Sequence, residues 1–223
     1  MNNSPVWKSH CLADSIHSIT HLTGVKNENI YHNLNFTCTI GFSAASSENS
    51  PYPKEAPIDF LKDNIRLIQT KGKTVFDLTS GEGRNAVYLA EQGFDVTGID
   101  RSAEAIEKAR KLAEKRRVSV HWIQADREHF FIPENSADVI VISYYLQRSL
   151  FPQIKKALKP GGYLVIETYD RDHLNYHADF PPEFTLNRNE LTKTFSDLKI
   201  TNYQYKDKKQ RVTDSIMAAK PLA

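Results

Sequence analysis

The sequence has little cysteine, no long apolar run and no large excess of charge. Its two cysteines, Cys11 and Cys38, are too few for a disulfide framework or a cysteine-rich metal site. No apolar run approaches the ~18 residues of a membrane span, and residues 1–8 lack the pattern of a secretory signal. With 29 basic and 27 acidic residues, the net charge of +2 favours neither nucleic acid nor a membrane as partner. We therefore expect a cytoplasmic protein; its oligomeric state stays open.

The chain divides by composition into two parts. Its 223 residues are about 1.5 times an average domain, with 40% hydrophobic and 25% charged residues, which suits one folded domain with an appendage. Residues 1–50 are rich in Ser, Asn and Thr and are expected to be an N-terminal extension whose order the sequence leaves open. Four histidines in this extension follow no compact metal-ligand spacing, so no metal site is predicted: His10, His17, His21 and His32. Residues 51–223 are expected to form the domain.

Strand and helix patterns alternate from residue 57 onward. Apolar runs predict strands at residues 74–78, 94–99, 118–123, 137–142 and 163–168, with helical patterns between most of them. Residues 198–205 and 211–219 are two further strands, close enough in sequence to pair only as an antiparallel hairpin. This order predicts an α/β protein with an open, doubly wound, mostly parallel sheet and helices on both faces, because a barrel needs ~250 residues.

Several local signals set the expected ends of helices. Ser102 is placed to cap a helix whose apolar face includes Ile106 and Leu112. The run Lys-Pro-Gly-Gly at residues 159–162 is expected to stop a helix over residues 150–158. Asn187 with Glu190 has the spacing of a helix cap.

The loop after the first strand carries the strongest functional signal. Gly81 and Gly83 allow a sharp turn and close approach of a ligand, and the helix that follows offers an anion seat. Asp77, at the strand end, disfavours the pyrophosphate of a dinucleotide and favours a ligand with both an ammonium and a carboxylate group. S-adenosylmethionine carries both, whereas the alternative for Asp77 is a solvated turn residue.

Acids also follow the next two strands. Asp100 ends the second strand, where a carboxylate can accept two hydrogen bonds from a ribose diol or merely cap the next helix. Asp126 follows the third strand and is placed to hold the amino group of adenine. Because ligands bind at the carboxyl ends of parallel strands, three such acids beside the glycine loop predict a nucleoside cofactor.

These residues resemble a known family. The stretch 75–86 followed by Val-Thr-Gly-Ile-Asp at 96–100 resembles the class I S-adenosylmethionine-dependent methyltransferases, as does the turn at 158–162. Residues 52–57, 81–86, 144–151 and 167–169 are similar to the tellurite-resistance (TehB-like) subgroup. The resemblance implies a Rossmann-like sheet of seven strands with the last one antiparallel, and S-adenosyl-L-methionine bound along the strand ends.

The predicted site has a cofactor part and an acceptor part. The residues expected to contact the cofactor lie in the loops after the first four strands: Asp77, Thr79, Gly81, Gly83, Asn85, Asp100, Arg101, Asp126, Ser143 and Tyr144. The candidates for catalysis are Tyr145, Arg148 as an anion contact, and His173 as a base or anion contact. Each has a structural alternative, namely core packing, a surface ion pair and an ordinary loop histidine.

The expected activity is methyl transfer to a small-molecule acceptor, for example a thiol or a metalloid oxyanion such as tellurite or selenite. Such soft anionic acceptors need no general base. Two other functions stay open at this point: an NAD(P)-dependent oxidoreductase, and a non-catalytic module that binds S-adenosylmethionine. A basic run at residues 108–117 is interleaved with glutamates, so it is interpreted as a solvated helix face rather than an RNA contact.

Overall fold

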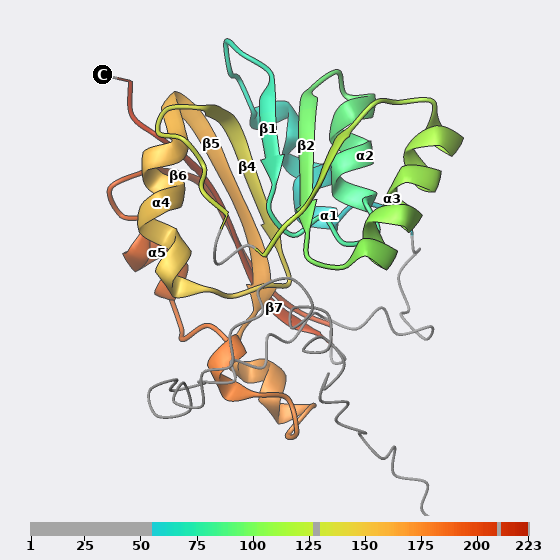
Figure 1. Ribbon diagram of the computed structural model, residues 1–223. Helices are drawn as coiled ribbons and strands as arrows, with labels where there is room; N and C mark the ends of the chain where they lie inside the picture. Colours follow the sequence, from blue (N-terminus) through green and yellow to red (C-terminus); the bar gives the residue numbers. More distant parts are fainter. Residues whose placement is uncertain (1–54, 127–129, 209–210, 223) are drawn as a thin grey trace, which may run out of the picture. The chain divides into compact units, whose positions relative to one another are not determined.

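The computed structural model describes residues 55–126, 130–208 and 211–222. Within them one sheet runs through the middle of the domain, with helices on both sides (Figure 1). The expected N-terminal extension, residues 1–50, lies outside the described residues, so its boundary stays a prediction. No helix in the described part of the chain is both long and apolar enough to span a membrane.

The described residues form a seven-stranded sheet of order β3-β2-β1-β4-β5-β7-β6. Neighbours are parallel except at β7, which is antiparallel to both β5 and β6. This confirms the predicted doubly wound, mostly parallel sheet with its antiparallel last strand. The strands are β1 (Thr74–Asp77), β2 (Asp95–Asp100), β3 (His121–Gln124), β4 (Ala137–Ser143), β5 (Leu158–Tyr169), β6 (Lys199–Asp207) and β7 (Val212–Ala219).

Five α-helices and four short 3-10 helices connect the described strands. The α-helices are α1 (Asp59–Asn64), α2 (Arg84–Glu91), α3 (Ala103–Arg116), α4 (Phe151–Ala157) and α5 (Glu190–Thr194). The 3-10 helices are η1 (Ile65–Leu67), η2 (Arg148–Leu150), η3 (Arg171–Asn175) and η4 (Pro182–Phe184).

The core lies in two layers, one on each face of the sheet. On β4, Val139 and Val141 pack with α1, α2 and α3, whereas Ile140 and Ile142 pack with α4 and α5. Every residue of β4 is buried. This two-sided burial is what a near-continuous apolar strand in a parallel sheet predicts, and it puts the strand ends at a rigid central position.

Two predicted boundaries differ in the structure. The third strand begins at His121 rather than 118, because Arg117 is left-handed and the amide of Val118 closes the end of α3 on Ala113. Residues 159–162 do turn, but as an excursion within β5: Leu158 pairs with Ala137, while Tyr163 already pairs with Val139.

The predicted caps differ in outcome. Ser102 caps α3, because its side chain accepts a hydrogen bond from the amide of Ala105 at 3.2 Å. The expected Asn187–Glu190 pair forms, with the Asn187 amide donating to Glu190 at 2.9 Å, but the N-cap position of the five-residue α5 is occupied by Asn189.

Replacing Ser102 by Ala is expected to lower the free energy of unfolding by about 1 kcal/mol, because the Ala105 amide loses its partner in the first turn. Urea unfolding followed by circular dichroism measures the change, with exposed Ser149 replaced by Ala as a control. An equal effect of the two changes would contradict the capping role.

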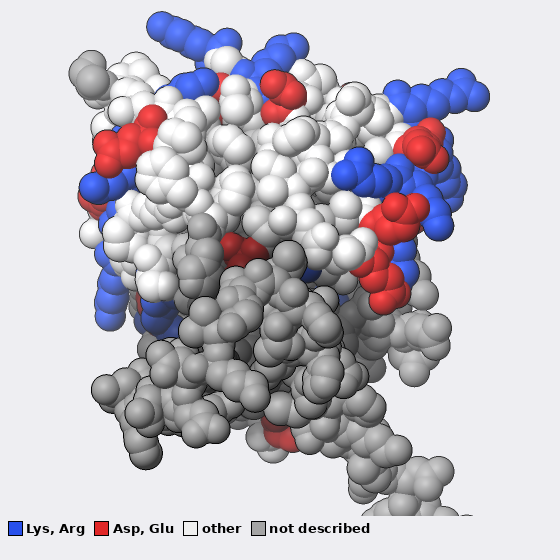
Figure 2. Space-filling view, in the orientation of Figure 1, with Lys and Arg blue, Asp and Glu red and all other residues white. Residues whose placement is uncertain are grey.

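The basic run on α3 forms ion pairs with acids around it. Lys108 lies 3.0 Å from Glu104 and 3.1 Å from Glu82, and Lys115 lies 2.6 Å from Glu55. Red and blue side chains alternate over α3, at the right of Figure 2. The helix therefore presents a mixed-charge surface, as the interleaved glutamates indicated.

Candidate cofactor and acceptor site

The two glycines after β1 serve different purposes. Gly81 has φ of +51°, and a Cβ placed on it would meet nothing within 4 Å, so this part of the loop borders open space. Gly83 has φ of +89°, and a Cβ there would lie 2.7 Å from the Cβ of Ala109. Gly81 thus leaves room for a ligand, whereas Gly83 allows α2 to pack closely against α3.

Helix α2 begins directly after this loop. Gly83 is its first flanking residue, and no side chain caps the helix. Uncapped amides and the helix dipole together favour a negatively charged group at this place. The loops after β1, β2, β4 and β5 lie along the lower edge of the sheet in Figure 1.

Two of the three predicted acids are buried and shape the loop. Asp77 is fully buried, and its Oδ1 accepts a hydrogen bond from the Thr79 amide at 3.3 Å. Asp100 accepts from the Gly81 amide at 3.1 Å through one oxygen and from the Ser102 amide at 2.9 Å through the other. Asp100 therefore joins the glycine loop to the start of α3, and its contact with a ribose stays a prediction.

The remaining predicted contacts on this side are exposed. Asp126 is an exposed residue just beyond β3, at the border of the described residues. Arg101 is also exposed, and its backbone carbonyl accepts a hydrogen bond from Gln124 at 3.3 Å.

A hydrogen-bond network links β1, α2 and β4 behind the site. The Ser143 amide donates to the Thr79 hydroxyl at 2.7 Å, and the Asn85 side chain donates to the Ser143 hydroxyl at 3.0 Å. Asn85 also accepts from the amide of Ile58 at 3.0 Å. Because the oxygen and nitrogen of its amide both have partners inside the protein, Asn85 fixes the positions of the surrounding loops.

Tyr144 directly follows β4, and its backbone is strained. Its φ is +52°, a region that non-glycine residues seldom occupy. Its amide donates to the carbonyl of Glu167 at 2.8 Å, and its hydroxyl donates to the Glu167 carboxylate. Burial, and next the charge of Glu167, raise the pKa of Tyr144, so the hydroxyl keeps its proton at neutral pH.

Two arginines lie against Tyr144. The Arg211 guanidinium donates to the Tyr144 hydroxyl at 2.6 Å and lies 4.5 Å from the ring centre, while the Arg84 guanidinium lies 5.4 Å from that centre. Cations near the face of an aromatic ring are attracted by its electron density. Tyr144 is thereby held between the start of α2 and the start of β7.

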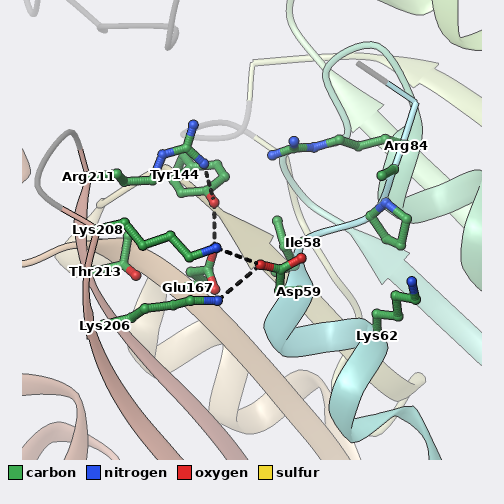
Figure 3. Close-up of a pocket in the computed structure, with 12 residues that line it drawn as sticks. Ile58, Asp59, Lys62, Arg84, Tyr144, Glu167, Lys206, Lys208, Arg211 and Thr213 are labelled. Carbon is green, nitrogen blue, oxygen red and sulfur yellow. Dashed lines mark hydrogen bonds and ion pairs between the residues drawn. The ribbon is translucent and has the colours of Figure 1, made fainter. Parts of the chain in front are cut away.

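A cavity of about 190 Å³ opens beside Tyr144 (Figure 3). Its wall combines α1, α2, β4 and β5 with the β6–β7 hairpin. Two carboxylates line it, those of Asp59 and Glu167. Five cationic side chains also line it: Lys62, Arg84, Lys206, Lys208 and Arg211. The excess of positive charge makes the cavity suitable for an anion.

The sequence interpretation named none of these cations as site residues. It ended the strand at residue 205, yet Lys206 belongs to β6, and Lys206 and Lys208, two residues apart, both line the cavity. Asn202 of β6 contacts Asn64 of α1. Side chains of a strand alternate between its two faces, so a strand extended past residue 205 would have placed Lys206 on the same face as Asn202. The burial of β6 follows this alternation, because every second residue is half-buried.

Two of the predicted catalytic residues lie elsewhere. Tyr145 packs partly buried against the core, and its hydroxyl donates to Gln147 at 3.3 Å. Arg148 pairs with Glu190 through two nitrogens, at 2.5 and 2.9 Å, and donates to the Thr185 carbonyl at 3.1 Å. Neither residue lines the cavity, so both take the structural alternatives considered above.

His173 is buried in an aromatic cluster. Its ring stacks on Tyr169 at 4.5 Å between centres and lies 5.1 Å from Phe180. Burial lowers the pKa of His173 to about 4, and its Nδ1 accepts from the Val212 amide at 3.4 Å. A neutral imidazole that accepts at Nδ1 carries its proton on Nε2, so the ring is arranged for packing rather than as a base.

Strand β7 also carries a buried acid, Asp214. It is fully buried, and the Tyr203 hydroxyl donates to one of its oxygens at 2.8 Å. Burial raises the pKa of Asp214 to about 6. Because the unfolded pKa is near 3.8, this group favours the folded state below pH 3.8 and loses that contribution as pH rises through 6.

Replacing Asp214 by Asn is therefore expected to stabilise the protein at pH 8 by about 1–3 kcal/mol, and at pH 5 by about half as much. The amide keeps an acceptor for Tyr203 but cannot ionise. Chemical unfolding at both pH values measures the difference, with exposed Asp179→Asn as the control. A gain that does not grow with pH would contradict the raised pKa.

Comparison with known proteins identifies the class of the domain. Residues 69–217 match the methyltransferase domain family, and the chain belongs to this family. Its fold and glycine loop are those of a class I methyltransferase that depends on S-adenosylmethionine.

The chain is similar in sequence to TehB proteins and to other methyltransferases. The chain is 28% identical over 175 residues to the probable S-adenosyl-L-methionine-dependent methyltransferase TehB of Haemophilus influenzae, covering 74% of this chain and 60% of that protein. It is 30% identical over 138 residues to a ubiquinone biosynthesis O-methyltransferase of Hydrogenovibrio crunogenus, covering 58% of this chain and 56% of the relative. The chain thus spans only about 60% of the length of the curated TehB relative.

Solved structures agree with the fold. The crystal structure of TehB from Haemophilus influenzae matches with a TM-score of 0.61 at 25% identity, over 72% of this chain and 61% of that one. The [4+2]-cyclase SpnF matches with a TM-score of 0.59 at 17% identity, over 74% of this chain and 81% of that one, a likeness in fold alone. Since such a fold also serves a cyclase, the activity has to be inferred from the site.

Proposed function

We propose that this protein transfers a methyl group from S-adenosylmethionine to a small anionic acceptor, either a thiolate or a metalloid oxyanion such as selenite or tellurite. The observation that carries the proposal is the cavity beside Tyr144, with five cations against two carboxylates. It adjoins the start of α2, where the glycine loop ends.

The loop residues fit S-adenosylmethionine. Open space beside Gly81 admits a ligand close to the backbone, and the uncapped start of α2 suits a carboxylate. Asp77 would accept the ammonium group, and Asp100 and Asp126 would contact the nucleoside. When bound, this cofactor supplies a methyl group that is already electrophilic because it is carried on a sulfonium.

The work left to the chain is to bind and orient the acceptor. Arg211 and the two lysines of the hairpin would attract and hold an anion, and alignment of two reactants contributes up to ~7–11 kcal/mol to lowering a barrier. Tyr144 keeps its proton and donates a hydrogen bond to the Glu167 carboxylate, so its hydroxyl does not act as a base. A soft anion needs no base, which matches these side chains.

The test begins with the cofactor. Calorimetric titration with S-adenosylhomocysteine is expected to give micromolar binding, whereas NAD and NADP are expected not to bind. Absence of S-adenosylhomocysteine binding in folded protein would overturn the cofactor assignment.

The acceptor is then identified by transfer of a labelled methyl group to selenite, tellurite, small thiols and a neutral phenol. Methylation of one of the anions or thiols, and not of the phenol, is the expected result. Methylation of the phenol alone would overturn the anionic acceptor, and binding of S-adenosylhomocysteine without transfer to any compound would favour the non-catalytic module.

A further inference from the structure

A carboxylate of the protein itself already occupies part of the cation-lined cavity. Oδ2 of Asp59 accepts hydrogen bonds from Nζ of Lys206 at 3.0 Å and from Nζ of Lys208 at 3.2 Å. Figure 3 shows both lysines reaching across the cavity to this one oxygen. These interactions lower the pKa of Asp59, the Lys206 hydrogen bond contributing most, so the carboxylate is ionised at neutral pH.

The position of Asp59 is set by its neighbours. It is the first residue of α1, between Ile58 and Phe60, which are both buried. The Ile58 amide is also held by the buried side chain of Asn85 at 3.0 Å. Asp59 therefore projects toward the hairpin from a well-anchored backbone, while its side chain makes no contribution to the core.

The ion pairs are exposed enough to be exchanged. The side chain of Asp59 is 47% exposed, and those of Lys206 and Lys208 are 29% and 43% exposed. Ion pairs in contact with water contribute little net free energy, because their charges are almost as well solvated apart. A second anion can therefore replace Asp59 at the lysines without loss of a core interaction.

We propose that Asp59 is an internal competitor of the acceptor, and that the acceptor binds by displacing its carboxylate from Lys206 and Lys208. This inference rests on the proposed function, because it places the anionic acceptor in the same cavity. Asp59 then sets the apparent affinity for anions: it raises the dissociation constant of every anion by one common factor, the inverse of the fraction of molecules in which the lysines are free of the carboxylate.

The test compares Asp59→Asn with Asp63→Asn. Asp63 lies on the same helix, is exposed and does not line the cavity, so its replacement removes the same charge without freeing the lysines. Selenite and acetate are titrated into each protein saturated with S-adenosylhomocysteine. We expect Asp59→Asn to lower the dissociation constant of selenite about three- to tenfold by removing the competing carboxylate, and Asp63→Asn to leave it unchanged.

The dissociation constant of acetate should fall by the same factor in Asp59→Asn, because a carboxylate that must leave the lysines before any anion binds raises both dissociation constants equally. A merely structural role of Asp59 would weaken binding when the residue is replaced, so tighter binding separates the two roles. Asp59→Ala provides a second variant with the same expected direction, and the dissociation constant of S-adenosylhomocysteine verifies that each protein is folded.

Two outcomes overturn the proposal in different ways. If wild type binds selenite and the Asp59 variants bind it equally or less tightly, Asp59 is not a competitor, while the proposed function stands. If S-adenosylhomocysteine binds normally but neither anion binds to wild type or variant, the cavity is not an anion site, and the acceptor class fails together with this inference.

Discussion

Replacing Asp77 by Asn is expected to weaken binding of S-adenosylhomocysteine by about 10- to 100-fold. Asp77 is fully buried at the end of β1, where it already accepts a hydrogen bond from the Thr79 amide. The amide variant keeps an oxygen for that bond but loses the charge that would hold the ammonium group. A hydrogen bond to a charged group contributes about 1.5–3 kcal/mol, which corresponds to this loss of affinity.

Isothermal titration calorimetry measures this prediction, and unfolding without ligand verifies that the variant folds. Asp95→Asn is the matched control, because Asp95 is exposed at the opposite end of β2. Equal affinities of wild type and Asp77→Asn would show that the ammonium group binds elsewhere, and the interpretation of the glycine loop would have to be revised.

Replacing Arg211 by Gln is expected to lower kcat/KM for an anionic acceptor by about 100-fold, with little change in binding of S-adenosylhomocysteine. Arg211 lines the cavity and holds Tyr144 through a 2.6 Å hydrogen bond and a stacked guanidinium. Its loss removes charge from the cavity and releases a side chain with a strained backbone. Removal of one member of a partly buried charged contact costs about 2–5 kcal/mol in binding, enough for this effect.

The variant Arg211→Lys separates the effect of the positive charge from that of the planar guanidinium group. Lysine keeps the positive charge but lacks the planar group that stacks on Tyr144, so an intermediate rate is expected. Lys199→Gln, at the far end of β6, is the control for loss of one charge. If Arg211→Gln retains the wild-type rate with the acceptor, the cavity is not where methyl transfer takes place.

Much of the fold follows from local patterns. Each buried strand carries an apolar run, and the cap of α3 follows from Ser102 with its own neighbour Ala105, three residues away. The differences lie where a partner distant in sequence decides. Residues 159–162 follow the end of α4 as expected, but Gly161 and Gly162 also exchange hydrogen bonds with Lys220, about 60 residues later, which keeps the turn within β5.

The two halves of the site differ in the same way. The predicted cofactor loops follow consecutive strands, and parallel strands bring their carboxyl ends to one edge, so the position of Asp77 and Asp100 at that edge followed from order alone. The cation-lined cavity, where we propose that the acceptor binds, combines α1 with a hairpin about 150 residues later. No local spacing relates Asp59 to Lys206, and the two come together only because β6 completes the edge of the sheet beside α1.

The chain's own residue order was sufficient for the class of fold, the cofactor edge and the family resemblance, because these depend on periodicity and on short motifs that act within one loop. It was not sufficient for the acceptor site. Arg148, the residue predicted to contact an anionic acceptor, is paired with Glu190. Arg211, which was not predicted, is the arginine that contacts Tyr144. Which charge faces the cavity and which is neutralised depends on the partner that packing brings within a few ångströms.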